Sequence, residues 1–83
     1  MSEEQITKKI IEILRGYVKD SSLLEKATQE THILKDLKVN SARLVDIIIK
    51  CEDVFGTSID DDDADRIATI GDAVALIRLK ATA

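Results

Sequence analysis

The feature that most constrains the fold is the spacing of the aliphatic residues, which recur at intervals of three and four. No segment alternates apolar and polar residues as a half-buried strand does, so the pattern favours helices. The first helical stripe consists of Ile6, Ile10, Ile13, Leu14 and Tyr17. Ser2 and Gln5 precede it with the spacing of a capping box, which predicts a helix over residues 3–19.

A second helix is expected over residues 41–55, followed by Gly56 as a stop signal. Its apolar positions are 44, 45, 47, 48, 49, 51, 54 and 55. This set is wider than one stripe, so we expect this helix to be the most buried one. A short acidic turn or helix is expected over residues 60–65, ending near Ile67. Thr69 and Asp72 form a capping-box-like pair before a last helix over residues 70–79.

The connection between the first two long helices is the least regular part of the chain. Asp20, Ser21 and Ser22 break the helical pattern, and the mixed residues up to Asn40 leave room for one short helical turn. The apolar anchors in this stretch are Leu23, Leu24, Ile33, Leu34 and Leu37. Connections of this length are unusual unless they have a role. The sequence thus predicts a single all-α domain over residues 1–83, a small bundle of three main helices and one short one.

Composition narrows the possible partners. Hydrophobic residues make up 45% of the chain, but Tyr17 and Phe55 are its only aromatic residues, so the core must rest on aliphatic packing. The net charge is −4, and residues 39–83 carry nine acidic and five basic side chains. Few aromatic platforms and a negative charge disfavour nucleic-acid binding. Basic protein partners are the natural complement.

The single cysteine, Cys51, rules out an intramolecular disulfide, so an oxidising compartment is not implied. It shares an apolar stripe with Leu44, Ile48 and Phe55, which predicts core packing for its thiol. There is no basic segment followed by an apolar one at the start, and no apolar run of membrane-spanning length. We therefore expect a cytoplasmic protein without membrane insertion.

Metal binding and catalysis are both disfavoured. The aspartates at 61, 63, 65 and 72 fall at the first, third, fifth and twelfth positions of a calcium loop. However, Arg66 occupies the position that requires glycine, and the twelfth position lacks the bidentate glutamate, so no metal site is expected. His32 is the only histidine and no triad can be assembled around a serine, so we expect no enzymatic activity.

Ser41 is the residue most suggestive of function. It lies at the expected start of the second helix, where unpaired backbone N–H groups and the helix dipole favour a negatively charged phosphate. Local chemistry alone leaves two alternatives open. Either Ser41 accepts a phosphate-type modification, or Asn40 or Ser41 simply caps the helix.

The order of residues around Ser41 resembles that of the acyl carrier protein family over residues 31–77. The residues that carry the resemblance are Thr31, Asp36, Leu37, Ser41, Val45, Asp46, Glu52, Asp53, Phe55, Ile59, the acidic stretch to Ala64, Ile67 and the run from Thr69 to Ala73. The chain departs from the family pattern at Lys38, Asn40 and Ala42, where the family often has Gly, Asp, and Leu or Met. These departures indicate a specialised member.

The resemblance implies a carrier mechanism. A phosphopantetheinyl transferase would move 4'-phosphopantetheine from coenzyme A to Ser41, and acyl groups would ride on its thiol as thioesters. The residues that would line an acyl pocket are Val45, Ile49, Ile59 and Ile67. Asp46, Glu52 and Asp53 would contact basic docking patches on acyl-loading and acyl-using enzymes, with Arg43 and Lys50 as selectivity elements.

The expected pathways are fatty-acid, lipid or polyketide biosynthesis, served by a monomer. Two alternatives remain at this stage. An aminoacyl or peptidyl carrier would share the arm and differ in cargo. An unmodified helical interaction module would use the second helix for binding, and Ser41 would only cap it.

Overall fold

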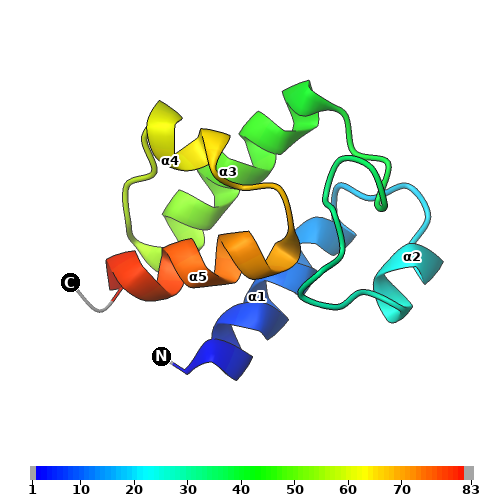
Figure 1. Cartoon of the computed structure of the whole chain (residues 1–83), viewed down its shortest axis with the longest axis horizontal. Helices are drawn as coiled ribbons and strands as arrows, with labels where there is room; N and C mark the ends of the chain where they lie inside the picture. Colours follow the sequence, from blue (N-terminus) through cyan, green and yellow to red (C-terminus); the bar gives the residue numbers. More distant parts are fainter. Residues whose placement is uncertain (1, 82–83) are drawn as a thin grey trace.

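Five helices and no strands make up the part of the chain, residues 2–81, that the computed structural model describes. They are α1 (Glu3–Arg15), α2 (Ser22–Glu25), α3 (Ser41–Phe55), α4 (Asp61–Asp65) and α5 (Ile70–Ala81). The expected all-α class is confirmed, and the helical turn expected in the long connection is α2. Figure 1 shows α1 and α5 packed at one side of the molecule, with α3 crossing above them and α4 beside it.

The core is organised around α1, which packs against both α5 and α3. Its buried residues are Ile6, Ile10, Ile13 and Leu14. The predicted capping box is confirmed, because Ser2 Oγ accepts from the Gln5 N–H and Gln5 Oε1 accepts from the Ser2 N–H. The predicted end at residue 19 was wrong. The helix ends at Arg15, and the chain turns so that Val18 is buried.

The prediction that the second long helix is the most buried was also wrong. Only Ile47, Ile48 and Cys51 of α3 are buried, whereas Val45, Ile49 and Val54 are exposed. The reason is that one side of α3 packs against α1 and contributes Ile47 and Cys51 to the core. The side that carries Val45 and Ile49 faces only open hollows lined by α4, the loop before it and Tyr17. The helix ends at Gly56, whose left-handed φ of 62° suits a residue without a Cβ.

The long connection between α1 and α3 is held in place by buried side chains and by backbone hydrogen bonds. Leu24, Ile33 and Leu37 are buried as the anchors were expected to be, and Val39 joins them. The Ile33 N–H donates to Ala68 O at 3.0 Å, and the Gly71 N–H donates to Gln29 O at 2.8 Å. These backbone hydrogen bonds attach the connection to the turn before α5 and to the start of that helix.

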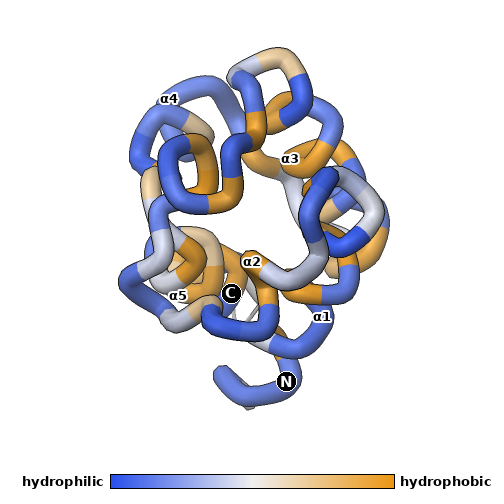
Figure 2. Tube along the Cα trace, turned by 90° about the vertical axis from the view of Figure 1, so that its right-hand side faces the viewer, coloured by the Kyte–Doolittle hydropathy of each residue, from blue (hydrophilic) through white to orange (hydrophobic). Residues whose placement is uncertain are grey.

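The two C-terminal helices differ in how they are held. The capping-box-like pair before α5 is confirmed, since the Thr69 N–H donates to Asp72 Oδ2 and the Asp72 N–H donates to Thr69 Oγ1. This helix extends to Ala81, beyond the predicted end at 79, and buries Ile70, Val74 and Ile77. By contrast, α4 has no buried residue and is almost entirely hydrophilic along its trace (Figure 2). Its position therefore depends on the flanking residues Ile59 and Ile67, which pack against the core, and on polar contacts.

Candidate functional site

Ser41 is the first residue of α3, and its side chain is exposed. The capping role belongs to Asn40, whose Oδ1 accepts from the Arg43 N–H at 2.8 Å. Within residues 2–81, no hydrogen bond engages the Ser41 hydroxyl. Of the two alternatives left open by the sequence, the cap is thus assigned to Asn40, and the serine hydroxyl is available for chemistry.

A phosphate ester on this hydroxyl fits the surroundings. It would lie beside the first turn of α3, where backbone N–H groups and the helix dipole attract negative charge. Next to it, a hollow of about 510 Å³ is lined in part by Lys38, Asn40 and Arg43. With Lys19, three cationic side chains line this open hollow, which leaves space for a long, negatively charged substituent.

A second hollow, of about 150 Å³, lies between α3 and α4. Three of the four expected acyl-pocket residues, Val45, Ile49 and Ile59, line it. Val45 and Ile49 are 56% and 57% exposed, so their apolar surface is not needed for the core. The fourth, Ile67, is half-buried against the core and does not line this hollow. An apolar site between the two helices is therefore present, built from α3 and the loop before α4.

The charged residues expected to meet partners divide into two groups. Arg43, Asp46, Lys50 and Asp53 are exposed on α3. Arg43 and Asp46 form a solvent-exposed ion pair at 3.7 Å, which adds little stability. Glu52 differs, because its Oε2 accepts from the Ile59 N–H at 3.0 Å in a half-buried setting. It holds the loop before α4 and lines the α3–α4 hollow.

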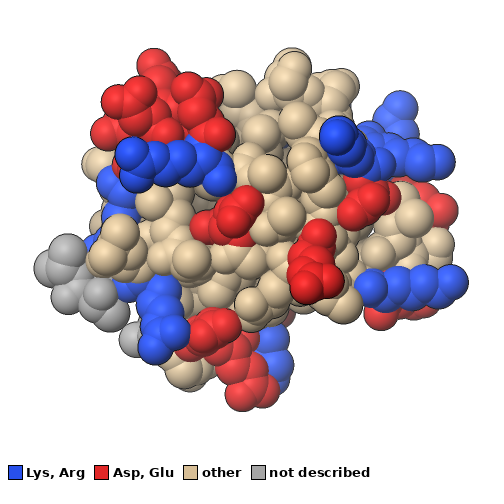
Figure 3. Space-filling model, viewed as in Figure 1, with Lys and Arg blue, Asp and Glu red and all other residues tan. Residues whose placement is uncertain are grey.

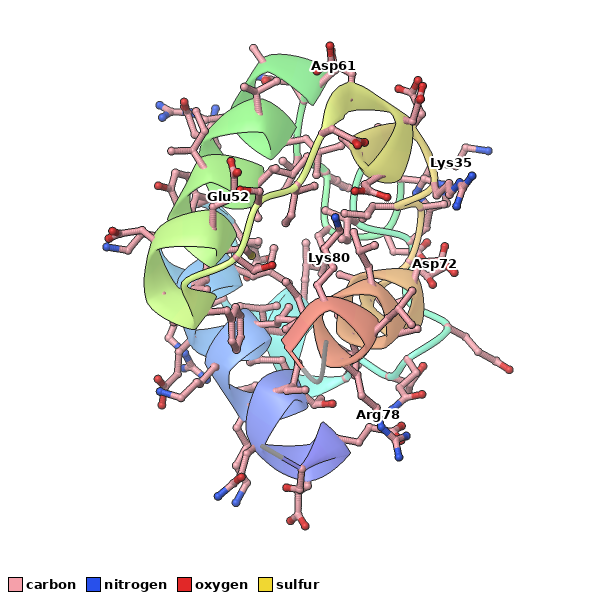
Figure 4. All side chains as sticks on the ribbon, turned by 90° about the vertical axis from the view of Figure 1, so that its left-hand side faces the viewer. Lys35, Glu52, Asp61, Asp72, Arg78 and Lys80 are labelled. Atoms are coloured by element: carbon pink, nitrogen blue, oxygen red, sulfur yellow. The ribbon has the colours of Figure 1, made fainter. Side chains whose placement is uncertain are left out.

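An ion pair that the sequence does not reveal joins α4 to α5. Lys80 Nζ lies 2.6 Å from Asp63 Oδ2, and the two side chains are only 26% and 16% exposed. The hydrogen bond from Lys80 lowers the pKa of Asp63 below its ordinary value. Asp63, with Asp60 and Glu52 nearby, raises the pKa of Lys80. Figure 4 shows Lys80 extending from α5 into the space between α3 and α4. Asp63 and Lys80 are 17 positions apart in the sequence, so no local pattern could have predicted the pair.

The other reactive side chains take no part in this site. Cys51 is buried in the core, and burial raises the pKa of its thiol to about 11. His32 accepts the Lys35 N–H through Nδ1, and its backbone forms an isolated bridge with Thr69. Among the described residues, no group of three or more His, Cys, Asp or Glu side chains is arranged to hold a metal ion.

An exposed serine at the start of a long helix, with a small hollow lined by apolar residues further along the same helix, is the arrangement expected of a carrier domain. Residues 8–77 match the family described as the phosphopantetheine attachment site. The chain is 40% identical over 80 residues to an acyl carrier protein of Lactobacillus acidophilus, covering 94% of this chain and 95% of that protein. It is also 40% identical over 81 residues to an acyl carrier protein of Desulforapulum autotrophicum, covering 96% and 99%.

The fold gives the same answer. The solved structure of an acyl carrier protein from Enterococcus faecalis superposes with a TM-score of 0.77 at 30% identity, covering 96% of this chain and 99% of that one. This chain belongs to the acyl carrier protein family.

Family membership establishes the class of function. The protein is a carrier and not an enzyme, and its cofactor is covalent 4'-phosphopantetheine, whose thiol bears acyl groups as thioesters. A carrier must meet a transferase that installs the arm and enzymes that handle the acyl group. No helix within the described part of the chain is long and apolar enough to span a membrane.

Proposed function

We propose that the hydroxyl of Ser41 is the attachment point of the phosphopantetheine arm, and that the protein presents acyl groups from there to biosynthetic enzymes. The observation that carries this proposal is that two neighbouring residues have separate roles at the start of α3. Asn40 caps the helix, which leaves the exposed Ser41 hydroxyl without an intramolecular partner among the described residues. Because the cap does not use Ser41, modification costs the fold little.

The α3–α4 hollow is the proposed site for the acyl chain, lined by Val45, Ile49 and Ile59. Ile67, which the family resemblance also assigns to this pocket, is half-buried against the core and would reach the chain only if the hollow widened. At about 150 Å³ the hollow matches a cavity that holds a molecule the size of benzene. A short chain therefore fits as the helices stand, and a longer chain requires α3 and α4 to separate.

The proposed docking surface is the exposed side of α3. Asp46 and Asp53 would meet basic patches on partner enzymes, while Arg43 and Lys50 would reject partners whose basic groups fall opposite them. Asp46, Ile49, Lys50 and Asp53 line a hollow of about 330 Å³ together with Tyr17, so charged and apolar groups are adjacent there. Glu52 is half-buried and accepts the Ile59 N–H, so it contributes less to this surface than its sequence position suggests.

The remaining parts of the proposal concern context. The carrier would act as a cytoplasmic monomer in fatty-acid, lipid or polyketide biosynthesis. A single domain is supported by the radius of gyration of 11.5 Å, which agrees with the value of about 12 Å expected for a compact chain of this length.

Intact mass measured before and after incubation with coenzyme A and a permissive phosphopantetheinyl transferase tests the attachment site. We expect the wild type to gain one phosphopantetheinyl group and Ser41→Ala to gain none. Ser58→Ala is the matched control, because Ser58 is also exposed and lies in the loop before α4. Loading of Ser41→Ala would refute the assignment. No loading of the wild type by two different transferases would favour an unmodified interaction module.

A further inference from the structure

The position of α4 depends on few contacts. None of its five residues is buried, and its sequence contains four carboxylates that repel one another. Figure 3 shows the resulting acidic surface over α4 at the upper left of the view. Asp60 caps the helix by accepting from the Asp63 N–H at 2.8 Å, but this bond is internal to the segment. Contacts with other elements must hold α4 near α3.

Two of these contacts are polar, and each comes from a different long helix. From α3, Glu52 accepts the Ile59 N–H and so fixes the loop that leads into α4. From α5, Lys80 reaches Asp63 of α4 at 2.6 Å, with both side chains mostly covered. The charges of Asp60 and Glu52 also act on Lys80. The ammonium group of Lys80 thus contacts one carboxylate of α4 and feels the charges of two more, from α3 and from the loop before α4.

These contacts bound the α3–α4 hollow. Glu52, Ile59 and Asp60 all line it, and Asp63 lies one residue from Ala64, which lines it too. A displacement of α4 away from α3 would enlarge the hollow. The Lys80–Asp63 pair ties α4 to α5, so it opposes any such displacement that also separates α4 from α5. We propose that Lys80 is a positioning residue whose ion pair with Asp63 restrains α4 and thereby limits the length of acyl chain that the hollow admits.

This inference rests on the proposed function for its consequence, whereas the restraint itself exists without cargo. Lys80→Met removes the charge and keeps the length and apolar stem of the side chain. Asp63→Asn removes the same ion pair by neutralising the carboxylate. Lys80→Arg keeps a positive charge at position 80 and serves as the conservative variant. Arg78→Met is the matched control, because it also removes a cation from α5, where Arg78 pairs with Glu3 of α1 at 3.0 Å.

The first measurement is amide hydrogen exchange of the unloaded protein. The reporters are the N–H groups of Ala64 and Arg66, which bond to Asp60 O and Asp63 O. Exchange at these amides should rise by about threefold or more in Lys80→Met and Asp63→Asn, because local opening of α4 becomes easier. Arg78→Met and Lys80→Arg should match the wild type. Unchanged exchange in folded Lys80→Met and Asp63→Asn would overturn the restraint.

The second measurement is cleavage of acyl thioesters by hydroxylamine after loading with acetyl, octanoyl and dodecanoyl arms. In the wild type, the octanoyl thioester should be cleaved more slowly than the acetyl thioester, because the octanoyl chain enters the hollow. The dodecanoyl thioester should be less protected than the octanoyl one. In Lys80→Met the dodecanoyl thioester should be cleaved about fivefold more slowly than in the wild type, because the open state that accepts it is more populated. Identical chain-length profiles would overturn the proposed effect on cargo.

Failure of the wild type to load would show up as an absent mass gain, before any cleavage is measured. That result would refute the proposed function and the effect on cargo together. The hydrogen-exchange result would still decide whether Lys80 restrains α4.

Discussion

At the residue scale, the backbone at Lys38 is the clearest departure from what the side chain prefers. Its φ is 56°, a left-handed value that it alone adopts among the described residues other than glycine. A Cβ in this region costs about 1–2 kcal/mol, whereas glycine adopts it freely. The family often has glycine here, and the structure supplies the reason: the loop must turn through this conformation just before α3.

Replacing Lys38 with glycine should therefore stabilise the protein. The relief of strain exceeds the added entropy of the unfolded chain, so we expect the free energy of unfolding to rise by about 0.5 kcal/mol. Urea unfolding followed by circular dichroism measures this. Lys35→Gly, in the same loop but without a positive φ, should lower the free energy of unfolding. Equal losses in both variants would contradict the interpretation.

Cys51 leads to a second prediction at this scale. Burial raises the pKa of its thiol to about 11 from an ordinary value of 9.0, so near pH 8 the thiolate is about a hundredfold scarcer than in an exposed cysteine. Iodoacetamide should therefore leave the native unloaded protein unmodified over a period in which the urea-unfolded protein is fully alkylated. Mass spectrometry measures the extent of alkylation of the native and the unfolded protein, and Cys51→Ala serves as the unreactive control. Alkylation at similar rates in both states would show that the thiol is accessible. If it is inert, native alkylation of the loaded protein reports the arm thiol alone.

At the element scale, the caps were predictable from sequence and the exposed faces were not. Ser2 with Gln5, and Thr69 with Asp72, act within one turn, so their spacing is sufficient to predict them. The burial of Ile47 and exposure of Ile49 depend instead on where α1, α4 and α5 lie around α3. Eight apolar positions on one helix give no indication of which side those neighbours cover. The Lys80–Asp63 pair was missed for the same reason, because it exists only after α4 and α5 are placed.

The cap of α5 has a pH dependence whose sign follows from the structure. Asp72 accepts the N–H groups of Thr69 and Ala68, which lowers its pKa below the ordinary value of 3.8. A carboxyl whose pKa is lowered by folding contributes stability that is fully present above its unfolded pKa. That contribution is lost as the pH falls through the lower, folded value.

We therefore expect Asp72→Asn, which mimics the protonated acid, to lower the free energy of unfolding by about 0.5–1 kcal/mol near neutral pH. The difference from the wild type should shrink toward zero as the pH falls below 3.8. Urea unfolding between about pH 7 and about pH 3 tests this, with Asp65→Asn in α4 as a control for the loss of one negative charge. A difference that grows at low pH would have the wrong sign.

At the scale of the whole molecule, two groups of apolar side chains have different environments. One set fills the core between α1, α3 and α5, and the other, Val45 and Ile49, is exposed beside the α3–α4 hollow. The fold gains little stability from the second set, since apolar surface that stays exposed to water is not removed from it on folding. Its position next to the hollow and on the same helix as Ser41 is explained if it serves the cargo. The resemblance in the sequence suggested this role, and the exposed fractions give it a physical basis.

Ile47 and Ile49 allow the two groups to be compared, because they lie on the same helix and differ only in what they face. Ile47 is 3% exposed, so Ile47→Ala should cost about 3 kcal/mol by leaving a cavity in the core. Ile49 is 57% exposed, so Ile49→Ala should cost about 0.5 kcal/mol or less. In the octanoyl-loaded protein, we expect the larger loss of thioester shielding in the variant with the smaller loss of stability. Ile49→Ala should lose shielding of the thioester from hydroxylamine.

Ile47→Ala, kept well below its unfolding temperature, should retain most of this shielding. Since stability and shielding should change in opposite orders, general weakening of the fold cannot produce the expected pair of results. A loss of shielding that follows stability in both variants would place the cargo in the core and not between α3 and α4.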